Sequence, residues 1–167
     1  MAITEKSPLK GKSVLVVDDE PDVLDTVAEL LEMCEVKTAG DFDTALNCLL
    51  NETFDFVILD IMGVNGFELL EKSVLRGFET VMLTAHAVTP DALKKSIKLG
   101  AAAFIPKEYM KEIEEVLENI LLGRGTQLWW RKNLGEGSNY FEKEFGQGWK
   151  EKDAFFKEFE KSLLKKP

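Results

Sequence analysis

Apolar runs alternate with helical repeats between residues 13 and 122 of this chain. The first run, Val14–Val17, is continuously apolar, which is typical of a strand that is covered on both faces. Pro21 follows at a favoured first-turn position, and apolar residues then recur at helical spacing. The pattern predicts strands at residues 14–17, 35–39, 54–59, 80–83 and 103–105. It predicts helices at residues 21–34, 42–50, 66–75, 90–100 and 108–122.

Two residues mark helix starts in this pattern. Asp41 and Thr89 each precede a helical repeat, and their side-chain oxygens can accept a hydrogen bond from a free backbone N–H, so both are expected N-caps. Strands that alternate with helices form βαβ units, which assemble into a parallel, doubly wound sheet. Every strand-to-helix loop then lies at one edge of the sheet, where ligands bind in such folds.

Acidic residues and a lysine stand at the ends of the predicted strands. Asp18 and Asp19 follow the first strand, and Asp60 follows the third. Lys107 comes shortly after the fifth. Because the ends of parallel strands converge, we expect these residues in one pocket, where a divalent cation would offset the repulsion between the carboxylates. A lysine beside that metal suits an anionic group, so the pocket indicates phosphoryl transfer.

Length and charge indicate an acidic chain of about one domain. Its 167 residues are enough for about one domain with a full core. The formal net charge of −9 disfavours non-specific DNA binding. Residues 123–167 carry 10 Lys and Arg against 7 Asp and Glu, so their net charge is +3 and that of the preceding residues is −12.

The cysteines and the lack of targeting signals favour a cytoplasmic protein. Cys34 and Cys48 have no metal-ligand spacing and lie in apolar helical patterns, so we interpret them as buried free thiols in a reducing compartment. No charged start leads into an apolar run, and no apolar stretch reaches about 18 residues. We therefore expect neither a signal peptide nor a membrane span.

Residues 123–167, which we call the C-terminal extension, differ in composition from the rest of the chain. They hold nine of the sixteen aromatic residues. We expect short helices at 126–134 and 139–145 and a longer one capped by Asp153, but no DNA-binding output domain. So many apolar side chains are not expected to stay exposed to water. We therefore expect the extension to pack on the preceding domain, to pair with another copy of the chain, or to bind a partner protein. Stacking on single-stranded nucleic acid is an alternative, which the helix-face spacing of the rings disfavours.

The order of the candidate site residues resembles that of a known family, the receiver domains of response regulators in two-component signalling. The residues that carry the resemblance are Asp18-Asp19, Asp60, Thr84-Ala85 and Lys107, in that order. The resemblance covers residues 13–122, about two thirds of the chain, and leaves 1–12 as an N-terminal lead. It implies a flavodoxin-like fold with five parallel strands in the order 2-1-3-4-5.

The resemblance implies a role for each residue of the acidic pocket. Asp60 would be the phosphoacceptor. Asp19 would bind Mg²⁺ directly together with Asp60, whereas Asp18 would act mainly through water. Met62, two residues beyond Asp60, would offer its backbone carbonyl to the metal.

Further roles are implied on the last two strands. The Thr84 hydroxyl would bond a phosphoryl oxygen, and Lys107 would pair with the phosphoryl group as a point charge. Phe104 matches the family's switch aromatic, whose rotamer follows the state of the threonine, although a plain core Phe is the competing interpretation. His86, the only histidine, is interpreted as a surface loop residue.

One loop departs from the family pattern. Members commonly carry Asp-x-x-Met-Pro-x-x-Asp-Gly after the third strand, whereas this chain reads Asp60-Ile-Met-Gly-Val-Asn-Gly66. The loop is thus two residues shorter and lacks the proline, and Gly63 would supply the backbone freedom that the tighter turn needs. A proline also precedes Lys107 instead of following it, so a trans peptide bond is expected after the lysine.

These observations predict a phosphorylation-controlled switch and not a turnover enzyme. A sensor histidine kinase or a phosphotransfer protein would supply the phosphoryl group. Output would be protein–protein association, including a homodimer, through the face of the fourth helix, fifth strand and last helix or through the C-terminal extension. No direct contact with nucleic acid or a membrane is expected. A phosphorylation-independent adaptor is the alternative, whereas a flavodoxin-like cofactor binder is disfavoured because the acidic pair would repel a phosphate.

Overall fold

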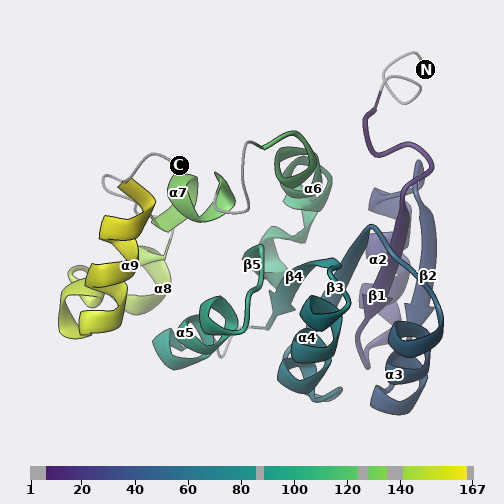
Figure 1. Ribbon diagram of the computed structural model, residues 1–167, viewed down its shortest axis with the longest axis horizontal. Coiled ribbons are helices and arrows are strands. Elements are labelled where there is room, and N and C mark those ends of the chain that lie inside the picture. The colour runs from purple at the N-terminus through teal and green to yellow at the C-terminus, as the bar shows by residue number, and fades with distance from the viewer. Residues whose placement is uncertain (1–6, 86–88, 124–127, 135–140, 165–167) are drawn as a thin grey trace.

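The computed structural model describes residues 7–85, 89–123, 128–134 and 141–164. Within them lies a parallel sheet of five strands in the order β2-β1-β3-β4-β5, flanked by helices (Figure 1). The strands are β1 (Ser13–Val17), β2 (Glu35–Ala39), β3 (Phe56–Asp60), β4 (Glu79–Thr84) and β5 (Ala103–Pro106). The flanking elements are α2 (Pro21–Leu30), α3 (Phe42–Asn51), α4 (Gly66–Leu75), α5 (Pro90–Lys98), η1 (Lys107–Glu112) and α6 (Ile113–Leu122). The predicted fold and strand order are confirmed.

Helices cover both faces of the sheet. α2 contacts α6, whereas α4 contacts both α3 and α5, so α2 and α6 lie on one face and the other three on the opposite face (Figure 1). β3 is buried at every residue, as its apolar run predicts for a central strand. The strands run in one direction, and their carboxyl ends form a single edge at which Asp60, Thr84 and Pro106 lie.

Both predicted N-caps are confirmed. Asp41 Oδ1 accepts a hydrogen bond from the backbone N–H of Thr44 at 2.8 Å. Thr89 Oγ1 accepts one from the N–H of Ala92 at 3.1 Å. Each cap satisfies an N–H group that the first turn of the helix leaves without an internal partner.

The prediction of one helix over residues 108–122 is wrong. The segment starts with the 3₁₀ turn η1, and Tyr109 leaves the helical region with φ −107°. No side chain caps η1, so nothing favours a regular α-helical start there, and α6 begins only at Ile113. The peptide bond after Lys107 is trans, as expected, since the described residues include no cis bond.

The C-terminal extension packs beside β5 and α5 (Figure 1). Its helical elements are α7 (Leu128–Leu134), α8 (Glu142–Phe145), η2 (Trp149–Lys152) and α9 (Ala154–Leu164). Two of these, α7 and α8, lie within the helices that we expected at 126–134 and 139–145, whose first residues, 126–127 and 139–140, are outside the described residues. Asp153 Oδ1 accepts a hydrogen bond from the backbone N–H of Phe155 at 2.8 Å, so the predicted cap of α9 is confirmed. The 3₁₀ turn η2 was not predicted.

Five aromatic side chains of the extension are buried. Trp129, Trp130, Phe141, Trp149 and Phe156 are each at most 5% exposed. Many of their rings meet edge to face, an arrangement that favours aromatic packing. Of the three outcomes that the composition allows, packing against the preceding domain is the one observed.

The cysteines and the helix lengths test two further expectations. Both cysteines are free, as predicted, but only Cys48 is buried; Cys34, which was also expected to be buried, is partly exposed. Burial raises the pKa of the Cys34 thiol to about 11, so the thiol is protonated at neutral pH. None of the helices in the described part of the chain has both the length and the apolar character needed to cross a bilayer.

Candidate functional site

Polar side chains from four strands meet at the carboxyl edge of the sheet. Asp18 follows β1, and Asp60 and Thr84 are the last residues of β3 and β4. Lys107 begins η1 directly after β5. Asp18, Asp60 and Thr84 are 1%, 4% and 5% exposed, so the edge places them inside the protein. Buried polar groups are costly unless they are paired, which makes this cluster a candidate for chemistry.

The ammonium of Lys107 lies among three carboxylates. Its Nζ is 2.9 Å from Asp18 Oδ2 and 2.8 Å from Glu20 Oε1. The distance to Asp60 Oδ1 is longer, at 3.7 Å. The lysine is therefore held by Asp18 and Glu20 and remains within ion-pair distance of Asp60.

Burial changes the protonation of these groups. Removal from water, with help from the charge of Asp18, raises the pKa of Asp60 to about 7, although the Lys107 ammonium works in the opposite direction. Burial also raises the pKa of Asp18, because it outweighs the hydrogen bonds from the Glu20 backbone and Lys107. For Lys107, burial disfavours the charged form, but hydrogen bonds with Glu20 and Asp18 outweigh it and raise the pKa. The lysine is therefore a permanent cation at neutral pH.

The donor set fits Mg²⁺. Asp18, Asp19 and Glu20 bring carboxylate oxygens within 4.8 Å of one another. Asp18 Oδ2 is buried, and its partner is the ammonium of Lys107, 2.9 Å away. The buried carboxylate of Asp18 and the exposed carboxylate of Asp19 are oxygen ligands of the kind that a small, hard cation prefers. Asp60 is outside this group of three, so its direct contact with the metal stays a prediction.

Glycines hold the shortened loop between β3 and α4 against the carboxylates. Gly63 has φ +80°, and a Cβ there would lie 2.4 Å from Asp19 Oδ2. At Gly66 a Cβ would lie 2.0 Å from the backbone oxygen of Asp60, and its N–H donates to the carbonyl of Ile61 at 3.0 Å. The expected backbone freedom at Gly63 is confirmed, and Gly66 is a second requirement that the sequence did not reveal.

We expect Gly63→Ala to weaken Mg²⁺ binding, because the added methyl group would displace the Asp19 carboxylate. Affinity should fall by about tenfold or more, measured by calorimetric titration. Gly77→Ala is a matched control, since Gly77 has φ +81° but no atom within 4 Å of the added Cβ. Both variants should lose about 1 kcal/mol of unfolding free energy through backbone strain, but the control should bind Mg²⁺ like the wild type. Equal Mg²⁺ affinities for the two variants would contradict a metal held by Asp19.

Four further residues were predicted to belong to the site or to lie near it. Thr84 lies at the site edge, as described. The Phe104 side chain is fully buried, and its ring is 6.0 Å from that of Phe141 in the C-terminal extension. Met62 is 72% exposed, so its side chain points into solvent, and the predicted role of its carbonyl stays a prediction. His86 lies outside the described residues.

Glu20 is the site residue that the sequence interpretation missed. It follows the acidic pair directly, and its carboxylate accepts a hydrogen bond from Lys107 at 2.8 Å. This hydrogen bond lowers the pKa of Glu20. A third consecutive acidic residue was the available signal, but its pairing with a lysine 87 positions away depends on the fold.

Comparison with known proteins gives one family. The model of the response regulator receiver domain matches residues 14–120. The two-component response regulator ARR10 of Arabidopsis thaliana is 33% identical over an alignment of 140 residues, and the match covers 77% of this chain and 24% of that protein. Response regulator Rre1 of Synechocystis is 32% identical over an alignment of 124 residues, and the match covers 65% of this chain and 51% of that protein. The chain thus spans about a quarter of the first relative and about half of the second.

Solved structures resemble the same part of the molecule in fold. The non-phosphorylated HemR receiver domain of Leptospira biflexa has a TM-score of 0.59 and 32% identity, and covers 68% of this chain and 97% of its own. A response regulator protein from Burkholderia pseudomallei, described with a phosphorylated aspartic acid and a calcium ion, has a TM-score of 0.59 and 25% identity. That match covers 69% of this chain and 68% of the other.

Proposed function

The chain belongs to the family of response regulator receiver domains, and on this premise we propose that it accepts a phosphoryl group on Asp60. The observation that carries the proposal is the setting of this carboxylate. Asp60 ends a buried strand, is 4% exposed and lies 3.7 Å from a permanent cation, Lys107. The phosphorylated aspartic acid and calcium ion of the Burkholderia relative support it by analogy.

The proposed reaction transfers a phosphoryl group from a donor to the carboxylate of Asp60. An oxygen of the ionised Asp60 attacks phosphorus, the bond from phosphorus to the donor nitrogen or oxygen breaks, and its electron pair leaves with the donor. The product is an acyl phosphate. Lys107 balances the added negative charge, and the hydroxyl of Thr84 donates a hydrogen bond to a phosphoryl oxygen. Mg²⁺, when bound by Asp18, Asp19 and Asp60, supplies charge neutralisation for the transferring group.

The family defines the class of partner. We propose that a sensor histidine kinase or a phosphotransfer protein in the cytoplasm supplies the phosphoryl group. Output then goes through protein–protein contact and not through DNA binding or turnover of a substrate. A homodimer through the α5–β5–α6 face stays a prediction, and that face is covered by the C-terminal extension in this structure (Figure 1).

A phosphorylation-independent adaptor is the second candidate, and the shortened loop favours it. With Gly63 against the Asp19 carboxylate, the loop leaves little room around that side chain. A receiver fold that cannot accommodate the metal would keep its binding surfaces but lose the chemistry.

Intact mass after incubation with acetyl phosphate separates the two candidates. We expect a gain of one phosphoryl group in Mg²⁺ and none in EDTA. Asp60→Asn should show no gain, whereas Asp43→Asn, which alters an exposed carboxylate in the first turn of α3, should match the wild type. No gain in the wild type, together with no binding of beryllofluoride, would reject the phosphoacceptor and favour the adaptor.

A further inference from the structure

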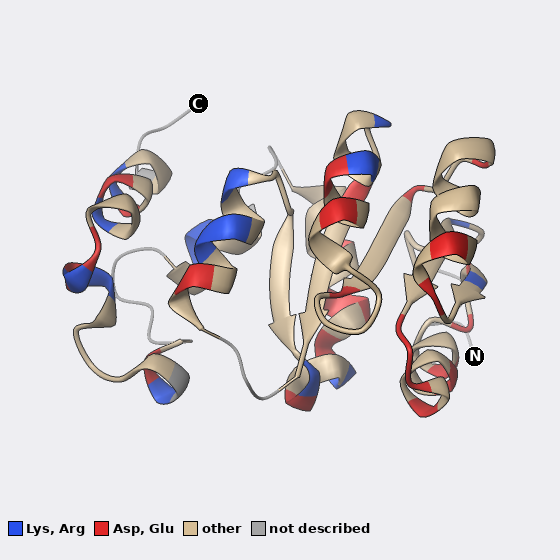
Figure 2. Cartoon of the chain, turned by 90° about the horizontal axis from the view of Figure 1, so that it is seen from below, with Lys and Arg blue, Asp and Glu red and all other residues tan. Residues whose placement is uncertain are grey.

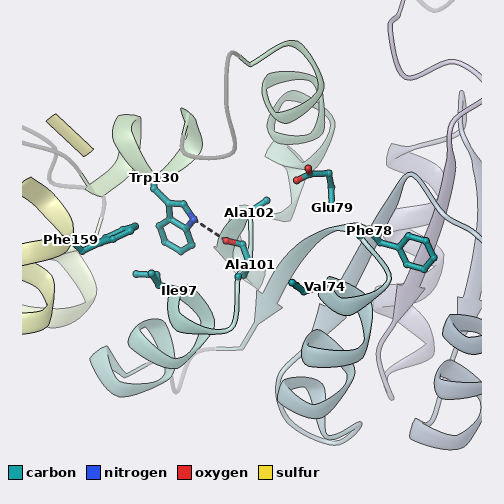
Figure 3. Close-up of a pocket in the computed structure, with 10 residues that line it drawn as sticks. Val74, Phe78, Glu79, Ile97, Ala101, Ala102, Trp130 and Phe159 are labelled. Carbon is teal, nitrogen blue, oxygen red and sulfur yellow. Dashed lines mark hydrogen bonds between the residues drawn. The ribbon is translucent and has the colours of Figure 1, made fainter. Parts of the chain in front are cut away.

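The C-terminal extension fastens itself to the end of the sheet that holds β5. The indole N–H of Trp130 donates a buried hydrogen bond to the carbonyl of Ala101 at 2.9 Å (Figure 3). Phe159, from α9, lies beside the same indole with ring centroids 5.9 Å apart (Figure 3). Two helices of the extension, α7 and α9, thus pack against the segment that leads into β5.

An ion pair fastens the extension to α5. Lysines gather on α5, between the sheet and the extension (Figure 2). Lys94 Nζ lies 2.5 Å from Asp153 Oδ2, and the two side chains are 26% and 30% exposed. Lys94 and Lys98 also lie over the ring of Phe155, at 5.7 and 5.3 Å from its centroid. The basic face of α5 therefore complements the start of α9.

An aromatic contact joins the extension to the strand next to the site. The ring of Phe141 lies 6.0 Å from that of Phe104 on β5 and 6.1 Å from that of Trp149. Phe104 is fully buried and stands three residues before Lys107. The contact therefore connects the aromatic core of the extension with the strand that carries the site lysine.

Lys107 has alternative partners, and a phosphoryl group would change which of them it contacts. Its ammonium is close to Asp18 and Glu20, at 2.9 and 2.8 Å, but 3.7 Å from Asp60. Phosphoryl oxygens on Asp60 would compete for this ammonium with more negative charge than either carboxylate. Lys107 directly follows β5, the strand that carries Phe104, so a change in the partners of the lysine would act on that strand.

The seam between the two parts leaves room for such a shift. A hollow of about 300 Å³ lies there, lined from the sheet side by Glu79, Phe78 and Ile97 and from the extension by Trp130 and Phe159 (Figure 3). Protein interiors are close-packed, so this open hollow leaves part of the contact between the sheet and the extension without packing atoms. The half-buried carboxylate of Glu79 adds a desolvated polar group to it.

From these contacts we infer that the C-terminal extension is the intramolecular partner of the α5–β5–α6 face, and that phosphorylation of Asp60 releases it through β5. This inference rests on the proposed phosphoacceptor function. By reciprocity, whatever loosens the extension must favour the phosphorylated state by the same factor. Release would expose the face and the aromatic rings of the extension together.

All three tryptophans of the chain, Trp129, Trp130 and Trp149, lie buried in the extension, so their emission reports its docking. We expect acetyl phosphate with Mg²⁺ to shift the emission to longer wavelength and to speed amide exchange in α7 and α9. Asp60→Asn should show neither change. Intact mass is measured on the same samples. A phosphoryl gain with unchanged emission and exchange overturns the coupling but leaves the proposed function standing, whereas no gain overturns both.

Variants of the seam test the reciprocal direction. Phe141→Ala should tighten beryllofluoride binding, followed by fluorine NMR, by about fivefold or more. Asp153→Asn is a gentler second variant, because asparagine keeps the cap of α9 but removes the charge that meets Lys94. Glu158→Lys is the control, since its surface pair with Lys161 has side chains 75% and 72% exposed. The coupling is overturned if both seam variants, Phe141→Ala and Asp153→Asn, already show the shifted tryptophan emission but bind beryllofluoride with wild-type affinity.

Discussion

Asp60→Asn should be more stable than the wild type at about pH 8 in EDTA. The folded-state pKa of Asp60 is about 7, whereas the carboxyl has an ordinary value of 3.8. The folded state therefore holds this proton more tightly than the unfolded state. The resulting stability is fully present below pH 3.8 and is lost as pH rises through about 7. The asparagine amide carries no charge at any of these pH values, so the variant does not lose stability as pH rises.

The size of this effect follows from the shift. One pKa unit corresponds to about 1.4 kcal/mol, so the full shift sets an upper bound of about 4 kcal/mol. We expect Asp60→Asn to gain about 2 kcal/mol at about pH 8 and little at about pH 4, measured by urea unfolding. Asp43→Asn, at an exposed carboxylate, should match the wild type at both pH values. Equal stability of Asp60→Asn and the wild type at the higher pH would contradict a desolvated, ionised Asp60.

Lys107→Met should be strongly destabilising in EDTA. The lysine side chain is 13% exposed, and the side chains of Asp18 and Asp60 are 1% and 5% exposed. Removal of the ammonium leaves two buried carboxylates without a cation, which should cost about 3 kcal/mol. Mg²⁺ should restore part of this stability, because the metal supplies the missing positive charge. Phosphorylation by acetyl phosphate should slow by about a hundredfold, since the charge on the transferred group loses one counterion.

A surface lysine provides the comparison for this variant. Lys37 pairs with Glu52, but the two side chains are 48% and 42% exposed. Lys37→Met should therefore cost less than about 1 kcal/mol and leave phosphorylation unchanged. If the two lysine variants lost similar stability in EDTA and responded equally to Mg²⁺, the buried charge cluster around Lys107 would be refuted.

Features set by local sequence were predictable in this protein. Asp41 and Thr89 cap their helices because a short oxygen-bearing side chain directly precedes a helical repeat. The continuous apolar runs mark strands that are buried on both faces. Parallel strands bring their ends together, so the meeting of Asp18, Asp60 and Lys107 followed from strand assignment alone.

Features that depend on side-chain direction or distant partners were not predictable. Glu20 competes with Asp60 for Lys107 because both carboxylates point to the same ammonium, which no spacing rule encodes. Helix-face spacing of the aromatic residues predicted their burial but not the surface that covers them. The hydrogen bond from Trp130 to Ala101 joins residues 29 positions apart and arises only when the extension has docked.

The central claim is that the Asp60 carboxylate forms an acyl phosphate, and chemical mapping tests it most directly. Borohydride reduces an aspartyl phosphate to homoserine, which peptide mass analysis locates in the chain. After treatment with acetyl phosphate and Mg²⁺, we predict homoserine at position 60 and at no other aspartate. Homoserine at another aspartate, or an unmodified Asp60 in a phosphorylated sample, would contradict the account.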